Sequence, residues 1–187
     1  MDNLVRKYAR LTPVAHLQLP SASPETFHRV HGVLLNEILL DPHLCAYPPA
    51  LEYQFKFWKW AVQGLEALIG DEVSLQIPFG VPLCDRATVQ DAEIDTRIYD
   101  RLMGLIQSTP SSQLLTGNSA PPSPSHVTYY LRPCPETPNL IQRVTLLESR
   151  TTIEQGTTGL KTWPAAHALA EWLGKHPGWS RPFRSRN

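Results

Sequence analysis

The residues best suited to binding a cofactor lie in a turn rich in glycine and threonine near the end of the chain. Residues 156–163 read Gly-Thr-Thr-Gly-Leu-Lys-Thr-Trp, and Pro164 follows them. The two glycines can adopt backbone angles that are closed to other residues, and they let a ligand approach the main chain. With Thr162 or Trp163 as N-cap and Pro164 as the first helical residue, free N–H groups and the positive end of the helix dipole face this turn. The turn therefore fits a nucleotide-type cofactor pocket, and it fits a plain strand–turn–helix junction equally well.

Other residues that could do chemistry form weaker patterns. His28 and His31 lie three positions apart, as two metal ligands on a helix would, but no third ligand follows at a suitable spacing. We therefore expect both histidines to lie on a surface. A group of acids flanks the start of an expected helix, where negative charge favours the helix dipole, and this interpretation is preferred over paired-carboxylate catalysis. These acids are Asp91, Glu93, Asp95 and Asp100.

Composition limits the class of protein. The 187 residues are 42% hydrophobic and include five Trp, which is enough apolar material for a folded core. The formal net charge is zero, so we expect neither nucleic acid nor an anionic membrane as partner. No apolar run approaches the roughly 18 residues that a membrane span needs. Cys45, Cys84 and Cys134 are far apart and form no C-x-x-C pair, which indicates a reducing compartment and a cytoplasmic protein.

The elements expected before the turn divide the chain into a helical part and a part with strands. Residues 1–107 are predicted to form an all-helical domain, with a short helix near Leu4–Leu11. Ser23-Pro24 starts a second helix that ends at Asp41-Pro42. The strongest helix pattern contains Leu51, Phe55, Trp58, Val62, Leu65 and Ile69 and is expected to end at Gly70. Its many aromatic residues indicate a helix–helix core rather than a platform for stacking bases. Residues 71–90 are expected to be irregular, and a last helix of this domain starts near Asp91.

A Ser- and Pro-rich segment, residues 108–126, is interpreted as a linker. Strands are expected at Val127–Arg132 and Ile141–Glu148, with a third short candidate at Thr151–Glu154, because these stretches are rich in β-branched and aromatic residues. The helix Pro164–Lys175 follows the glycine turn. Residues 178–187 form a short basic tail. The fold class expected from this order is α+β.

Several strings in both parts of the chain resemble one known family. In the second part they are Val-Thr-Leu-Leu-Glu-Ser at 144–149, Gly-Thr-Thr-Gly-Leu-Lys-Thr-Trp-Pro-Ala-Ala at 156–166 and Leu-Ala-Glu-Trp-Leu at 169–173. In the helical part they are Leu34-Leu35, Ile38-Leu39, Pro48-Pro49, Tyr53, Phe55 and Lys56. The chain resembles the protein-lysine methyltransferases that modify eukaryotic elongation factor 2, which belong to the seven-β-strand class that uses S-adenosylmethionine. The resemblance covers most of Glu25–Pro177.

The resemblance implies a fold, a cofactor and a partner. Residues 127–177 would be the incomplete entry segment of a methyltransferase domain, whose strands and helix begin a Rossmann-like sheet. Thr158, Gly159 and Trp163 would lie beside the pocket for S-adenosylmethionine, and the helix Pro164–Lys175 would pack on the sheet. The protein substrate would be the elongation factor.

Two departures from the family pattern limit the activity that the resemblance implies. Pro164 stands where the family usually has an acidic residue. More importantly, the family continues into a Glu-Leu-Gly-x-Gly-x-Gly loop that holds the cofactor, and none of the ten glycines of this chain forms such a loop. The chain is therefore expected to be a truncated family member without catalytic residues, inactive and unable to bind S-adenosylmethionine alone.

Two further hypotheses do not require catalysis. The helical domain 1–107 can serve as a non-catalytic protein-interaction module. Alternatively, the product is unstable, because an incomplete sheet leaves strand edges unpaired and the apolar face of the last helix uncovered.

Overall fold

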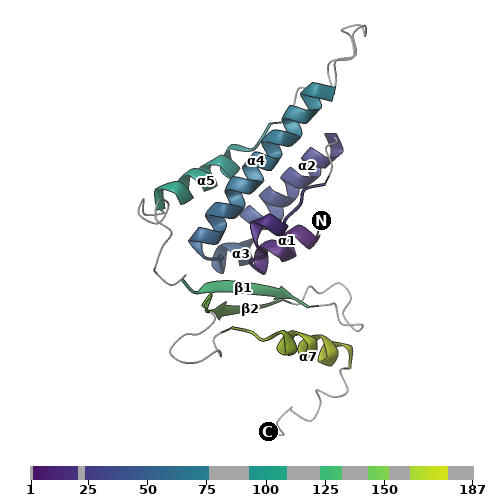
Figure 1. Ribbon diagram of the computed structural model, residues 1–187, viewed down its shortest axis with the longest axis vertical. Coiled ribbons are helices and arrows are strands. Elements are labelled where there is room, and N and C mark those ends of the chain that lie inside the picture. The colour runs from purple at the N-terminus through teal and green to yellow at the C-terminus, as the bar shows by residue number, and fades with distance from the viewer. Residues whose placement is uncertain are drawn as a thin grey trace. The chain divides into compact units, whose positions relative to one another are not determined.

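The chain folds into two compact units, Met1–Asn118 and Ser119–Asn187, which we call the helical unit and the strand unit (Figure 1). The computed structural model describes residues 2–20, 24–75, 93–108, 123–131, 143–151 and 161–176. Helices and strands are both present, so the expected α+β class is confirmed. Most of the expected linker, 109–122, lies outside the described residues, and the last two residues of that segment belong to the first strand.

The helical unit begins with α1 (Asp2–Ala9), which starts and ends two residues before the helix expected at Leu4–Leu11. The chain leaves α1 through Leu11, which adopts a positive φ of 57°. The Thr12 N–H then donates to the Lys7 carbonyl at 2.9 Å. A short 3₁₀ turn, η1 (Val14–His16), follows. This tight exit brings the segment after η1 back towards the other helices of the unit.

The second expected helix is present but changes type along its length. α2 (Pro24–Gly32) runs directly into η2 (Val33–Leu39), which is a π-helix. The Leu40 N–H donates to the Leu35 carbonyl, five residues earlier, as in a π-helix. Val33, Leu34 and Leu35 are all buried. The wider turn therefore lets three consecutive apolar residues be buried together.

Asp41 ends this helix as expected and also starts the next one. Its carboxylate accepts hydrogen bonds from the backbone N–H groups of His43 and Leu44, both at 2.9 Å. The resulting short helix is α3 (Pro42–Ala46), which the sequence analysis did not predict. Asp41 is an N-cap followed by Pro at the first position, an arrangement that favours a helix start even in a short segment.

The longest helix is α4 (Leu51–Leu75), and its predicted end at Gly70 is wrong. An interior glycine costs a helix only about 0.5–1 kcal/mol relative to alanine, so it ends a helix only when other signals agree. The first five residues of the segment expected to be irregular, 71–75, are accordingly helical. Of the predicted face, Trp58, Val62 and Leu65 are buried, Phe55 and Ile69 are half-buried, and Leu51 is 49% exposed. The buried residues are Tyr53, Gln54, Phe57, Trp58, Ala61, Val62, Leu65 and Leu68.

The last described helix of this unit is α5 (Thr96–Ser108), which packs against α4. It was expected to start near Asp91, but residues 93–95 are not helical and Asp91 lies outside the described residues. The Asp95 carboxylate accepts a hydrogen bond from the Arg97 backbone N–H at 2.9 Å. Asp95, one of the four acids expected to flank this helix start, therefore sets where the helix begins. Ile98 and Leu105 are buried towards the core of the unit.

The core of the helical unit is built largely from aromatic residues. The Tyr8 and Phe57 rings lie 4.4 Å apart, and Trp58 packs edge-on against Phe57. Tyr8, Phe57 and Trp58 are 4%, 0% and 1% exposed, which rules out their use as a surface for stacking bases and confirms the helix–helix interpretation for them. Among the described residues no helix is both long enough and apolar enough to pass through a bilayer.

Among the described residues, the strand unit has two antiparallel strands and one helix. β1 (Ser125–Tyr130) pairs with β2 (Arg143–Glu148) in a register that places Ser125 opposite Glu148 and Tyr130 opposite Arg143. Both strands were predicted within two residues at each end. Of the third strand candidate, Thr151 lies in a bend and 152–154 lie outside the described residues. α7 (Pro164–Lys175) has the bounds that the sequence predicted.

Candidate functional site

Trp163 is the one residue of the predicted cofactor set that the structure places. It is the N-cap of α7, with φ −76° and ψ 146°, and Pro164 follows in the first turn. The Ala166 N–H donates to the Trp163 carbonyl at 2.9 Å. The indole is 61% exposed. Thr158 and Gly159 lie outside the described residues. The structure therefore confirms the helix start, and the cofactor site stays a prediction.

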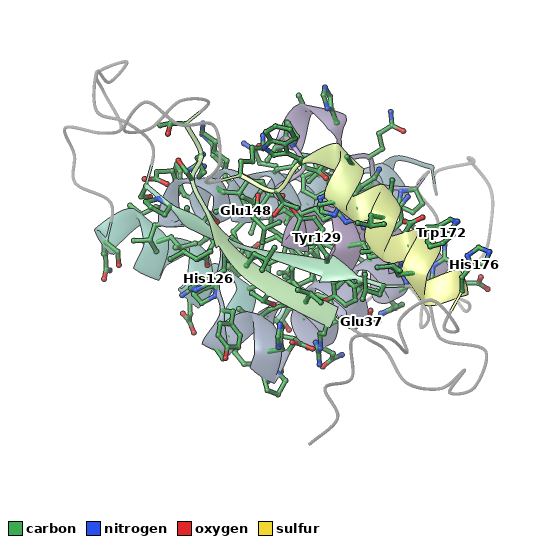
Figure 2. All side chains as sticks on the ribbon, turned by 90° about the horizontal axis from the view of Figure 1, so that it is seen from below. Glu37, His126, Tyr129, Glu148, Trp172 and His176 are labelled. Atoms are coloured by element: carbon green, nitrogen blue, oxygen red, sulfur yellow. The ribbon has the colours of Figure 1, made fainter. Side chains whose placement is uncertain are left out.

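A polar cluster, Tyr129–Glu148–His167, joins α7 to the two strands. The Tyr129 hydroxyl donates to Glu148 Oε1 at 2.8 Å, and the rings of Tyr129 and His167 lie 4.1 Å apart. Figure 2 labels Tyr129 and Glu148, which come from neighbouring strands. Glu148 is only 5% exposed, so its carboxylate depends on this phenol for hydrogen bonding. The contact between the Tyr129 and His167 rings joins α7 to β1.

The sequence analysis missed this cluster because the strand register was unknown. Tyr129 and Glu148 lie on the same face of the sheet only when Ser125 pairs with Glu148 and Tyr129 with Val144. A shift of one residue would place them on opposite faces. The sequence shows only that Glu148 ends a stretch rich in β-branched residues. It does not show that Glu148 lies near Tyr129 in the other strand.

The strand unit also exposes large apolar side chains, on α7 and separately on β2. We call Leu169 and Trp172 of α7 the apolar surface of the strand unit, whereas Leu147 lies on the face of the sheet opposite to Tyr129. On β2 Leu147 is 66% exposed, and on α7 Leu169 and Trp172 are 56% and 41% exposed. The Trp172 ring stacks on the His176 ring, with 4.6 Å between the ring centroids; both residues are labelled in Figure 2. The side of α7 that carries His167 faces β1, whereas Leu169 and Trp172 point to solvent. Uncovered apolar side chains of this size are typical of a surface that another element or protein covers.

His31 joins two helices through its imidazole ring. Its Nε2 accepts a hydrogen bond from the Asp95 backbone N–H at 3.0 Å and thereby joins α2 to the start of α5. Burial lowers the pKa of His31, although the nearby Asp95 carboxylate acts in the opposite direction. His28 is exposed, as expected, whereas His31 is half-buried. Within the described ranges no three metal-ligating side chains come together.

The helical unit has an open acidic groove between α4 and the start of α5. Its residues are Glu66, Ile69, Glu93, Ile94, Thr96 and Tyr99, and it encloses about 400 Å³. The Tyr99 hydroxyl donates to Glu66 Oε1 at 3.2 Å, and both hydrogen bonding to Glu66 and burial raise the pKa of Tyr99, burial being the larger cause. Two carboxylates beside isoleucine side chains suit a long basic side chain, whose aliphatic stem can lie on the apolar wall.

A second, smaller cavity lies between α1 and α2 and is lined by Lys7 among mostly apolar residues. The sequence analysis singled out neither hollow, because each is built from segments far apart in the chain. Comparison of the chain with models of protein families gives no match, and a search of the curated proteins gives none.

Proposed function

We propose that this chain belongs to the S-adenosylmethionine-dependent protein-lysine methyltransferases that modify elongation factor 2, in the cytoplasm. The observation that carries the proposal is the string at 156–166, which leads into a helix that starts at Trp163-Pro164, the position that the motif requires. In this proposal β1, β2 and α7 form the entry to a Rossmann-like cofactor domain. The apolar surface of the strand unit is the face that the sheet of such a domain covers.

The role assigned to this chain is protein binding rather than methyl transfer. Transfer of a methyl group to a lysine amine depends on holding the two reactants in line. The sequence contains no Gly-x-Gly loop that could hold the cofactor for this purpose. The helical unit, in contrast, has a complete aromatic core and an acidic groove of a shape that suits a basic segment of a partner.

Calorimetric titration of the chain with S-adenosylmethionine tests the cofactor part of the proposal. We expect no heat of binding at micromolar cofactor, while a complete methyltransferase of the same class, measured alongside, binds it. Binding at micromolar concentration by this chain would show that the residues present are sufficient for a pocket, and the assigned role would be wrong.

Biolayer interferometry with immobilised elongation factor 2 tests the partner. We expect the chain to bind, and the double variant Glu66→Gln/Glu93→Gln to bind several-fold more weakly because both carboxylates of the groove are neutralised. Glu37→Gln is the matched control, since Glu37 is an exposed acid on η2 and does not line the groove. Equal weakening by the control would indicate a general charge effect rather than the groove.

The groove also favours a second candidate function, a non-catalytic interaction module for a different basic partner. The two proposals differ in one measurement. Suppose the chain binds elongation factor 2 no better than it binds an unrelated protein of similar charge. That result would contradict elongation factor 2 as the partner and would support the interaction module.

A further inference from the structure

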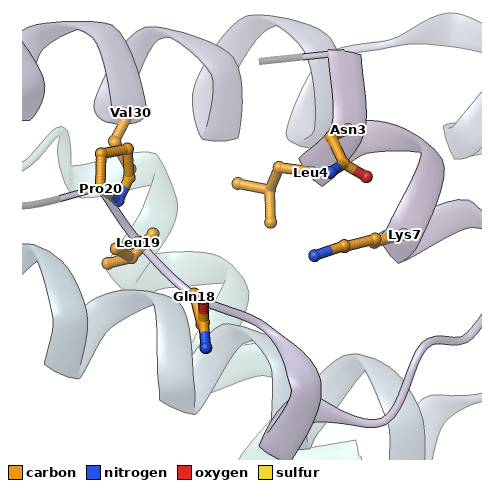
Figure 3. Close-up of a pocket in the computed structure, with 7 residues that line it drawn as sticks. All are labelled: Asn3, Leu4, Lys7, Gln18, Leu19, Pro20 and Val30. Carbon is orange, nitrogen blue, oxygen red and sulfur yellow. The ribbon is translucent and has the colours of Figure 1, made fainter.

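A cavity of about 140 Å³ opens between α1, α2 and the segment Gln18–Pro20, which follows η1 (Figure 3). Leu4, Leu19, Pro20 and Val30 form its apolar lining. Leu4 and Val30 are buried, at 8% and 0% exposure, so they form a floor continuous with the core. A cavity of about 150 Å³ can hold a ligand as large as benzene. This cavity is therefore large enough for one small organic group.

The polar part of the lining carries a positive charge. Asn3, Lys7 and Gln18 complete the cavity, and Figure 3 shows the Lys7 amine extending towards its open centre. The side chain of Lys7 is half-buried. No acidic residue is among the described residues that line the cavity with Lys7. An ammonium beside apolar walls attracts an anion more strongly than it would in open water.

The position of Leu19, which lines one side of the cavity, depends on Gly64 in α4. A methyl group on Gly64 would overlap the Cδ1 atom of Leu19. The absence of a side chain at Gly64 thus lets Leu19 lie against α4 while its segment lines the cavity. The cavity is formed by three separate segments of the chain, with buried Leu4 and Val30 at its base and exposed Asn3, Gln18 and Pro20 at its rim.

We propose that this cavity binds a carboxylate carried on a short branched aliphatic group. The aliphatic group would lie among Leu4, Leu19 and Val30, where removing apolar surface from water is favourable. The carboxylate would accept a charge-assisted hydrogen bond from Lys7 Nζ. The amides of Asn3 and Gln18 can then bind polar atoms next to the carboxylate. This site is separate from the acidic groove, and it does not depend on the proposed partner.

The experiment titrates isovalerate into the full ¹⁵N-labelled chain and follows amide chemical shifts by NMR. We expect saturable shifts at the amides of residues 3–7, 18, 19 and 30. Isovaleramide has the same shape without the charge and should bind about tenfold more weakly or worse, because the charge-assisted bond is lost. Lys7→Met should weaken isovalerate binding by a similar factor. Lys59→Met, at an exposed lysine of α4 outside the cavity, should leave it unchanged.

The carboxylate could come from a free acid or from the last residue of a peptide chain, and two further probes distinguish these sources. Tighter binding of N-acetyl-leucine than of isovalerate, with no binding of N-acetyl-leucinamide, would identify a chain terminus. Binding of isovalerate alone would identify a free acid. Both results support the carboxylate site. Non-saturable shifts with both acids, equal binding of isovaleramide, or unchanged binding by a folded Lys7→Met variant would each overturn it.

Discussion

Gln54 is a buried amide in the middle of an aromatic helix face, and its hydrogen bonds explain its presence there. Its Nε2 donates to the Pro49 carbonyl, which precedes α4, and its Oε1 accepts from the guanidinium of Arg101 on α5. The side chain is 2% exposed. One residue thereby satisfies a backbone carbonyl and joins two helices. The aromatic pattern of α4 gives no indication of this role, which depends on where α5 lies.

Replacing Gln54 by Met should destabilise the protein by about 1–3 kcal/mol. Methionine has a similar length but leaves the Pro49 carbonyl and the Arg101 guanidinium without their partner, and buried groups in that state cost energy of this order. Urea unfolding followed by circular dichroism measures the change. Gln63→Met is the control, since Gln63 is exposed on the same helix and should change stability by less than about 0.5 kcal/mol. Equal effects of the two changes would refute the role of Gln54.

His31 should make stability depend on pH. Burial lowers its pKa from the ordinary value of 6.5, so between 6.5 and the lower folded-state value the unfolded chain binds more protons than the folded chain. The contribution of His31 is therefore complete above pH 6.5 and is lost as the pH falls below it. Protonation also removes the acceptor for the Asp95 N–H. Urea midpoints measured at a series of pH values should show the decline.

The matched variants are His31→Gln and His16→Gln. Glutamine at position 31 retains an acceptor but does not titrate, so its stability should vary less below pH 6.5 than that of the natural chain. His16 is exposed on η1, and its replacement should leave the pH profile unchanged. A profile that is the same for His31→Gln and the natural chain would assign the pH dependence to other groups.

At the scale of elements, the sequence predicted what local chemistry decides. The start of α7 follows from Trp163-Pro164, and the end of the second helix follows from Asp41-Pro42, because capping and proline geometry act within a few residues. The end of α4 was missed because Gly70 lacks a supporting cap signal. The π-helix and the strand register were missed because they depend on packing partners distant in sequence. Thr158 and Gly159 stay predictions, since the structure does not describe them.

Two glycines on neighbouring helices should respond in opposite ways to alanine. An added Cβ at Gly104 in α5 would meet no atom within 4 Å, so Gly104→Ala should stabilise the protein by about 0.5–1 kcal/mol through helix propensity. At Gly64 the same change forces Leu19 to move, and overpacking of this kind typically costs about 1–3 kcal/mol. Gly64→Ala should therefore be destabilising on balance. Equal stabilisation in parallel urea titrations would show that Leu19 adjusts freely.

At the scale of the whole molecule, the two units divide the buried apolar core unequally. Apart from Val127, the buried apolar residues among those described all lie in the helical unit. The strand unit contributes buried polar residues, such as Thr128 and Glu148. Both units expose large apolar side chains, but the most exposed, Leu147 at 66% and Trp163 at 61%, belong to the strand unit. We infer that self-association, where it occurs, starts from the strand unit.

The double variant Leu147→Lys/Leu169→Lys should stay monomeric at concentrations where the natural chain associates. Both leucines are more than half exposed, at 66% and 56%, so the change removes apolar surface without opening the core. Sedimentation velocity over a concentration series measures the effect. Met103→Lys in α5 is the control, at 52% exposure in the helical unit, and should leave association unchanged. If association is lost only in Met103→Lys, the surface responsible for self-association lies on the helical unit instead.

The order of the two units along the chain has a consequence for synthesis. The described helices of the helical unit are complete by Ser108, before β1 begins at Ser125. N-terminal domains generally fold first on the ribosome, and helical units fold quickly because many of their contacts are local. The aromatic core can thus close while the strands are still being translated. A nascent chain released after Glu148 but before α7 would carry a finished helical unit and a strand pair that lacks the helix holding Tyr129.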